Sequence, residues 1–224
     1  MKLISEIMKA KKLLGGLLLA AMLIIVPSCE EALEQMSSVP TFYIPEVMYN
    51  GQTYQITRFA VCKYEFSSDS KYLTIKENED GKFIATVSGK WTEESSVNSV
   101  MVNVTAVNPD DNSVEPQVVQ TQLHDWDIRV FDGETAADFK GLKAGRTYTM
   151  KMYDSRTEKP VEMIYGSYND KANAQKLDWV YDKDKIESVG KEATSLAFKT
   201  LKSGACSATV SLGAYKRVIE LRVL

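Results

Sequence analysis

Histidine and cysteine are scarce in this chain. Its 224 residues include one histidine, His124, and three cysteines, Cys29, Cys62 and Cys206. A single imidazole argues against histidine-based catalysis and against a histidine-rich metal site. Three thiols rule out a disulfide framework. We expect Cys62 and Cys206 to be two small buried side chains rather than the partners of a bridge.

The chain also lacks long apolar runs and basic clusters. Its longest uncharged apolar run, Leu13–Val26, is shorter than the roughly 20 residues that a membrane-spanning helix needs. The net charge is −3, and no group of lysines and arginines offers a surface for phosphates, so we expect no nucleic-acid partner. Hydrophobic residues make up 44% of the chain and charged residues 25%, which excludes collagen and low-complexity disorder.

The first 28 residues are typical of an export signal. Four lysines precede the apolar run, and small residues follow it. A basic head, a short apolar stretch and a small-residue end predict a signal peptide over residues 1–28. Met1 and Met8 are equally good translation starts for it.

Cys29 ends a motif that resembles the bacterial lipobox. Val26-Pro27-Ser28-Cys29 has the aliphatic residue, the small residue and the cysteine of that motif. The resemblance implies that Cys29 is lipidated, which would anchor the protein to a membrane through several acyl chains. The acidic residues after it, within Glu30–Glu34, resemble the surface-export signal of Bacteroidetes-type lipoproteins. We therefore expect residues 29–39 to be a tether and the protein to be an outer-membrane lipoprotein exposed at the cell surface. A tether whose acidic residues are only solvated, without an export signal, and a cleavable signal with a spare cysteine are the alternatives.

Alternating apolar residues dominate the chain after residue 40. Clear examples are Val100–Val107 and Arg217–Val223, and turn sequences such as Asn50-Gly51 and Lys143-Ala144-Gly145 separate such runs. Short alternating segments between turns predict an all-β sandwich or barrel. Helical patterns are weak, and Glu134–Phe139, the best of them, is very short.

Two motifs recur in the same order. Gly51–Ile56 (GQTYQI) resembles Gly145–Met150 (GRTYTM), and Phe83–Gly89 matches Phe198–Gly204. An aromatic pair lies between the motifs in each copy: Tyr64 and Phe66 in the first, Trp179 and Tyr181 in the second. We interpret the chain as two tandem immunoglobulin-like β-sandwiches, at 40–124 and 125–224. The second has an extra hairpin or loop at about 153–176.

These motifs resemble the bacterial Ig-like group 2 domain of invasin- and intimin-type proteins. The first copy has an aromatic-Ser-Ser stretch in Tyr64–Ser70 and a glycine-spaced segment in Gly81–Gly89. The second copy departs from the pattern, since Leu196 and Thr200 replace two of the glycines and Asp182 and Asp184 replace serines. The resemblance implies a rigid spacer or adhesive module rather than an enzyme.

Exposed aromatic residues are the best candidates for ligand contacts. Trp91 follows a glycine-containing turn, and the extra segment carries Tyr165-Gly-Ser-Tyr168-Asn169. Loops on a rigid sandwich often carry recognition, so we select Trp91, Tyr165, Tyr168 and Asn169 as candidate ligand contacts. An added hairpin without a partner remains the alternative.

Catalytic and metal-binding patterns are missing. The acidic pairs Asp110-Asp111 and Asp182 with Asp184 lack EF-hand spacing, and His124 lies alone at the expected junction, where we expect it to bond the backbone. We predict no enzyme activity, cofactor or metal. The predicted function is a non-catalytic, lipid-anchored envelope protein that displays a binding or adhesion surface to a protein or glycan partner. The alternatives are a carbohydrate-binding lipoprotein of a glycan-uptake system and a subunit of a surface filament.

Overall fold

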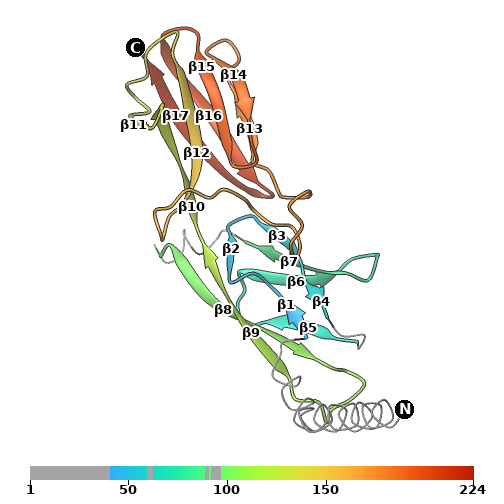
Figure 1. The fold of residues 1–224 in the computed structure, drawn as a ribbon. Helices are drawn as coiled ribbons and strands as arrows, with labels where there is room; N and C mark the ends of the chain where they lie inside the picture. The colour runs from blue at the N-terminus through green and yellow to red at the C-terminus, as the bar shows by residue number, and fades with distance from the viewer. Residues whose placement is uncertain (1–40, 60–62, 89–90, 92–96) are drawn as a thin grey trace, which may run out of the picture. The chain divides into compact units, whose positions relative to one another are not determined.

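The computed structural model describes residues 41–59, 63–88, 91 and 97–224. The expected signal peptide, Cys29, the tether at 29–39 and Cys62 lie outside these residues. The described chain is built from seventeen strands, which confirms the all-β prediction (Figure 1). Within the described ranges, no helix has the length and apolar character needed to cross a membrane.

The first nine strands form one sandwich. One sheet has the order β2-β9-β8-β5, and the other has the order β3-β7-β6. The short pair β1-β4 forms a two-stranded sheet of its own, and β4 follows β3 after a single residue. The strands are β1 Phe42–Tyr43, β2 Val47–Tyr49, β3 Thr53–Gln55, β4 Thr57–Arg58, β5 Glu65–Ser68, β6 Leu73–Glu77, β7 Phe83–Val87, β8 Ser99–Val107 and β9 Gln117–His124.

The alternating pattern of β8 shows why this sandwich forms. Val102 and Val104 are fully buried, whereas Met101 between the inward-facing positions is 55% exposed. Successive side chains of a strand point to opposite faces, so every second residue enters the core. The same rule brings Tyr54 of β3 and Leu73 of β6 into that core from the facing sheet.

The last eight strands form a second sandwich. Its sheets have the orders β11-β10-β12-β15-β14 and β13-β16-β17. Residues 134–139, the best helical candidate in the sequence, contain β11 instead. The strands are β10 Trp126–Asp132, β11 Thr135–Ala137, β12 Thr147–Asp154, β13 Asp178–Tyr181, β14 Ile186–Lys191, β15 Ser195–Thr200, β16 Gly204–Leu212 and β17 Tyr215–Val223.

The two sandwiches share one topology. The order β3-β7-β6 of the first corresponds to β12-β15-β14 of the second, and β9-β8-β5 corresponds to β17-β16-β13. In the first, β2 runs parallel to β9, and in the second Leu142 makes a parallel bridge with Val223. Two facing sheets with this division of strands, antiparallel except for this parallel contact, are the immunoglobulin-like arrangement.

The first repeated motif occupies the same place in both sandwiches. Gly51 and Gly145 each precede the equivalent strands β3 and β12, and both have a positive φ, of 84° and 76°. The tyrosine three residues later, Tyr54 or Tyr148, is buried in each core. Glycine is needed at the turn because other residues rarely adopt this backbone conformation.

The second repeated motif differs by two positions from the alignment that the sequence predicts. Tyr54 pairs with Ala85, and its equivalent Tyr148 pairs with Phe198, so Phe198 corresponds to Ala85 and not to Phe83. A shift of two residues leaves every side chain on the same face of a strand. The apolar pattern therefore could not distinguish the two alignments.

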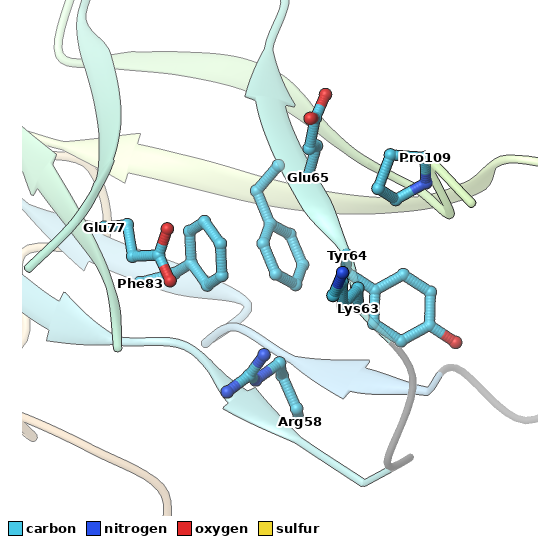
Figure 2. A pocket seen from close by; sticks show the side chains of 8 residues that line it. Arg58, Lys63, Tyr64, Glu65, Glu77, Phe83 and Pro109 are labelled. Carbon is cyan, nitrogen blue, oxygen red and sulfur yellow. The ribbon is translucent and has the colours of Figure 1, made fainter. Parts of the chain in front are cut away.

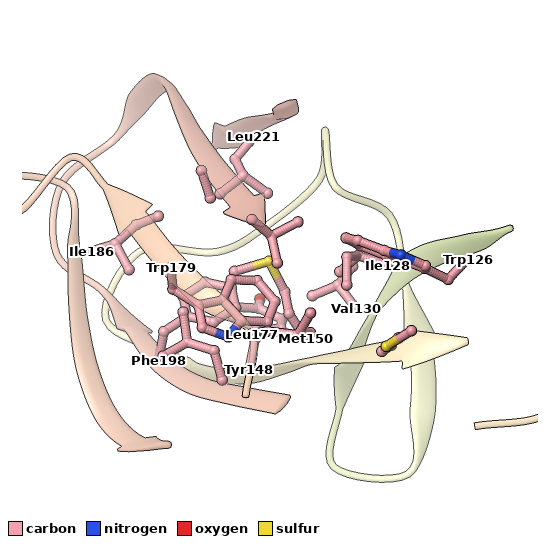
Figure 3. Packing of buried hydrophobic residues seen from close by; sticks show 14 of the residues in the cluster. Trp126, Ile128, Val130, Tyr148, Met150, Leu177, Trp179, Ile186, Phe198 and Leu221 are labelled. Carbon is pink, nitrogen blue, oxygen red and sulfur yellow. The ribbon is translucent and has the colours of Figure 1, made fainter. Parts of the chain in front are cut away.

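Trp179 lies at the centre of the second core. Its side chain points from β13 toward the sheet that contains Tyr148, Met150 and Phe198 (Figure 3). Only 6% of Trp179 is exposed. Tyr148 and Phe198 themselves pack with ring centroids 5.9 Å apart. A buried tryptophan on this strand is a hallmark of immunoglobulin-like sandwiches.

The buried hydrophobic residues separate into two clusters. One draws on residues 42–123 and the other on residues 126–223. We call the two groups of strands the first and second sandwich on this basis. The division of the chain into independently folding domains at residues 124 and 125 stays a prediction.

Candidate functional site

The segment between β12 and β13, residues 155–177, is the extra material expected in the second copy. It contains no named strand, although its Ile164 forms an isolated bridge with Gln175. This segment runs beside β3 of the first sandwich. Gly166 accepts a hydrogen bond of 2.8 Å from the Gln55 amide, and the Tyr165 carbonyl accepts one of 2.9 Å from Gln52 Nε2.

Gln175 completes the contact with β3. Its side-chain oxygen accepts a 3.1 Å hydrogen bond from the Thr53 amide, and its Nε2 donates to the Thr53 carbonyl. One glutamine thus satisfies both backbone groups of a strand residue, as a neighbouring strand would. We call residues 155–177 the latch, because they extend the edge of the first sandwich from within the second.

An aromatic pocket lies where the latch meets the first sandwich. Tyr168 packs edge-on against Tyr43, with ring centroids 4.7 Å apart, and against Phe59 at 5.7 Å. Beside these rings is a pocket of about 140 Å³. It is lined by aromatic and uncharged polar residues: Tyr43, Pro45, Tyr54, Tyr165, Ser167, Tyr168 and Asn169.

Three of the four predicted contact residues line this pocket. Tyr165 and Tyr168 are 36% and 44% exposed, and Asn169 is exposed beside them. Trp91 lies elsewhere: it has no exposed surface, and its ring packs 5.8 Å from that of Tyr72. In this structure Trp91 therefore belongs to the first core and offers no surface to a ligand.

The sequence did not predict that residues of the first sandwich form one wall of the pocket. Tyr43 comes from β1 and Tyr54 from β3, more than a hundred residues before the latch. Tyr54 was visible as part of a repeated motif, but that motif indicated a core residue. No local sequence pattern indicates that Tyr43 contacts the latch, because the contact depends on the tertiary arrangement.

The phenol groups of the pocket influence one another. Burial, then Glu46 and the phenols of Tyr168 and Tyr165, raise the pKa of Tyr43. Burial is the main cause of a raised Tyr54 pKa, Tyr43 raises it further, and a hydrogen bond with the Thr57 side chain lowers it. Both tyrosines therefore stay protonated at neutral pH and can donate as well as accept a hydrogen bond.

The turn that presents Tyr168 and Asn169 is fixed by Asp170. The Asp170 carboxylate accepts bonds from the amide and side-chain nitrogens of Asn173, at 3.0 and 2.8 Å, and from Ser167 Oγ at 3.4 Å. The bonds from Asn173 are the main cause of a lowered Asp170 pKa. Asn169 has a φ of 54°, a conformation that asparagine tolerates better than most residues.

A buried polar junction joins the two sandwiches beside the latch. Only Asp125 separates β9 from β10, and its carboxylate accepts hydrogen bonds from Asn50 Nδ2, at 3.1 Å, and from Arg217. Trp126 Nε1 donates to the Asn50 carbonyl at 2.8 Å. Asp125 is 5% exposed, so its charge is stabilised by these partners rather than by water.

His124 bonds a carboxylate and not the backbone as expected. Its Nδ1 lies 2.6 Å from Asp154 Oδ2, and both side chains are buried. Burial raises the pKa of Asp154, but hydrogen bonds from His124 and from the backbone of Thr157 and Arg156 outweigh it and hold the pKa below its usual value. Nε2 of His124 is buried and bonds no hydroxyl, thiol or other group of a described residue.

A larger cavity opens at another end of the first sandwich. It has a volume of about 400 Å³, and Figure 2 shows Arg58 beside the ring of Phe83. The guanidinium lies 5.6 Å from the centre of that ring, and Lys63 nearby forms an exposed ion pair of 3.3 Å with Asp110. The cavity contains none of the predicted contact residues. Its lining mixes both charges with aromatic rings: Arg58, Lys63, Tyr64, Glu65, Phe66, Glu77, Phe83 and Pro109.

The described residues show no arrangement for metal or thiol chemistry. Among them, no group of three or more histidine, cysteine, aspartate or glutamate side chains is placed to hold a metal ion. Cys206 is half-buried, and this burial is the main cause of a raised pKa of its thiol. The charge of Asp182 raises the pKa further, whereas that of Lys185 lowers it. A raised pKa disfavours the reactive thiolate.

Comparison with known proteins identifies similar structures but no family. No protein-family profile and no curated protein matches the chain. The D00-D0 domain of intimin matches with 8% identity and a TM-score of 0.31, over 82% of this chain and 98% of that one. The Escherichia coli adhesin FdeC matches with 14% identity and a TM-score of 0.27, over 80% of this chain and 62% of that one.

A third similar structure is that of domains 4–9 of the surface layer protein SbsC. It matches with 12% identity and a TM-score of 0.26, over 81% of this chain and 30% of that one. The chain thus spans less than two thirds of the FdeC and SbsC structures. By their names these are surface or adhesin proteins, but similarity at this level is too weak to transfer a function or a ligand.

Proposed function

We propose that the protein is a non-catalytic, lipid-anchored protein of the cell envelope whose two immunoglobulin-like sandwiches display a binding surface. Export and anchoring at Cys29 are supported by the basic head, the apolar run and the lipobox-like Val26–Cys29. The outer membrane and surface exposure are supported by the acidic residues that follow.

The observation that carries the display role is the double connection between the sandwiches. They are joined through Asp125 at the polar junction and again through the latch on β3. Two separate connections restrict hinge motion more than a single linker does, because both must break before the sandwiches can separate. Such a body suits the passive presentation of a surface away from a membrane.

Anchoring is tested by growing cells with radiolabelled palmitate. The label should enter the protein and be lost in Cys29→Ser, whereas Cys206→Ser, which removes a half-buried thiol, should keep it. Protease treatment of intact cells should then release peptides from the 41–224 region and leave a lipidated Cys29 peptide on the cells. Unlabelled protein inside the cell would refute the proposal.

The alternative of a glycan-binding lipoprotein is favoured by one observation, the aromatic pocket at the latch. Its exposed tyrosines and amide have the chemistry of a sugar-binding surface. The two proposals are compatible, since a displayed surface needs a partner.

A further inference from the structure

We propose that the pocket beside Tyr168 binds a single uncharged pyranose ring of a glycan. This inference rests on the proposed display function and specifies what the displayed surface recognises. The ring would enter between the latch and the first sandwich, with Tyr43 and Tyr54 on one side and Tyr165, Tyr168 and Asn169 on the other.

The size of the pocket fits one six-membered ring. Its volume is about 140 Å³. A protein cavity of about 150 Å³ accommodates benzene, whereas a water molecule takes about 30 Å³ of liquid. The pocket is therefore too large for a single water and too small for an oligosaccharide. A hexopyranose has twice the heavy atoms of benzene, so one terminal or branching unit would place its ring in the pocket and leave its outer hydroxyls and its neighbours in solvent.

The chemistry of the lining fits a sugar better than an apolar ring. A pyranose has a C–H face that packs on aromatic rings and hydroxyls at its rim that both donate and accept hydrogen bonds. Tyrosine phenols can do the same, and the Asn169 amide and the Ser167 hydroxyl add further donors and acceptors. A purely apolar ligand would leave these groups without partners once water was displaced.

The lining also indicates an uncharged sugar. None of the described residues that form the pocket carries a charge. The nearby Asp170 carboxylate is already bonded to Asn173 and Ser167. An acidic sugar would therefore meet no cation among the lining residues, and it would approach Glu46, whose charge acts on Tyr43 of the pocket wall.

Tyr54 contributes its ring to the wall of the pocket and not its hydroxyl. It is 1% exposed, and its hydroxyl is buried beside the Thr57 side chain, with which it forms a hydrogen bond. The polar groups that a bound sugar would meet are therefore those of the more exposed lining residues Tyr165, Tyr168 and Asn169.

The aromatic contacts of Tyr168 also hold the latch, so the test must separate binding from folding. Asn169→Gly removes the amide from the pocket, and glycine adopts the φ of 54° readily. Glu158→Gly is the matched control, because Glu158 lies in the same segment with a φ of 57° and does not line the pocket. Tyr165→Phe removes a hydroxyl and keeps the ring.

The experiment uses the full chain in a detergent without sugar groups, such as a dimethylamine oxide. The probes are the methyl glycosides of glucose, galactose, mannose and N-acetylglucosamine, with methyl glucuronoside as the acidic comparison. Saturation-transfer NMR detects contact with the sugar C–H protons, and calorimetry gives the affinity. A single ring should bind in the millimolar range.

The proposal expects at least one uncharged glycoside to bind saturably. Asn169→Gly and Tyr165→Phe should each weaken that binding by roughly 2- to 10-fold, the usual effect of one lost hydrogen bond, and Glu158→Gly should not. It is overturned if none of the four glycosides binds, if the acidic glycoside binds more tightly, or if Glu158→Gly weakens binding as much as Asn169→Gly. Palmitate labelling is unaffected by these outcomes, so failure of the pocket and failure of the anchor are distinguishable.

Discussion

The close contact between Gly51 and the second sandwich gives a sharp test of the junction. Gly51 and Gly145 are equivalent glycines with similar positive φ values of 84° and 76°. A Cβ added at Gly145 would meet no atom within 4 Å. A Cβ added at Gly51 would overlap the carbonyl oxygen of Leu212 and come within 2.8 Å of Tyr215 Cβ.

The two alanine variants should therefore differ in stability although the substitution is the same. Gly145→Ala introduces only the strain of a positive φ, which costs about 1–2 kcal/mol. Gly51→Ala adds the overlap with the turn between β16 and β17, and overpacking of this kind costs about 1–3 kcal/mol more. For a chain of this length each kcal/mol lowers Tm by roughly 2–4 °C.

Urea unfolding followed by tryptophan fluorescence measures both variants. We expect a single transition in the unsubstituted protein and in Gly145→Ala. Gly51→Ala should lose more of its free energy of unfolding and should show a second transition, because the overlap separates the sandwiches before either core unfolds. Equal losses of stability in the two variants would refute the close contact across the junction.

Three further results follow from the junction and the latch. Because hydrogen bonds lower the folded-state pKa of Asp154, its contribution to stability is present above about pH 4 and disappears as the pH falls further. Asp154→Asn should therefore lower the free energy of unfolding at pH 7 much more than at pH 3, unlike Asp178→Asn on the surface. Burial, then Asp154, raise the pKa of Tyr49 to about 12, so stability should fall as the pH rises from 10 toward 12. Tyr49→Phe should remove that part of the decline, and an unchanged alkaline profile would contradict the assignment. Gln175→Ala should speed hydrogen exchange at the Thr53 amide, and unchanged protection there would show that the side chain does not hold the latch.

The core of the fold could be predicted from local patterns. Val102 and Val104 alternate with less buried residues, and such alternation determines both the strand and its buried face. Turn glycines such as Gly51 and Gly145 gave the ends of strands for the same local reason. The sequence aligns Phe198 with Phe83, two residues from its structural equivalent Ala85. An apolar pattern with a period of two is the same in both alignments, so it does not distinguish them.

The site was less predictable because it combines distant segments. The composition of the loop predicts Tyr165, Tyr168 and Asn169 as contact residues, and the structure brings them together in one pocket. The same reasoning predicts Trp91, which is buried in the structure, because amino-acid composition does not determine exposure. The bond between His124 and Asp154 spans thirty residues and leaves no trace in either local sequence.

The pocket and the latch are thermodynamically linked. One wall belongs to the first sandwich through Tyr43, and the other belongs to the latch through Tyr168. A ligand that contacts both walls binds only while the latch is closed, so it must stabilise the closed state by RT ln(1 + [L]/Kd), about 2.7 kcal/mol at a hundred times Kd. By the same linkage, Gln175→Ala should weaken sugar binding although Gln175 does not line the pocket. If Gln175→Ala opened the latch and left the affinity for the sugar unchanged, the ligand would contact one wall only and would not bridge the two sandwiches.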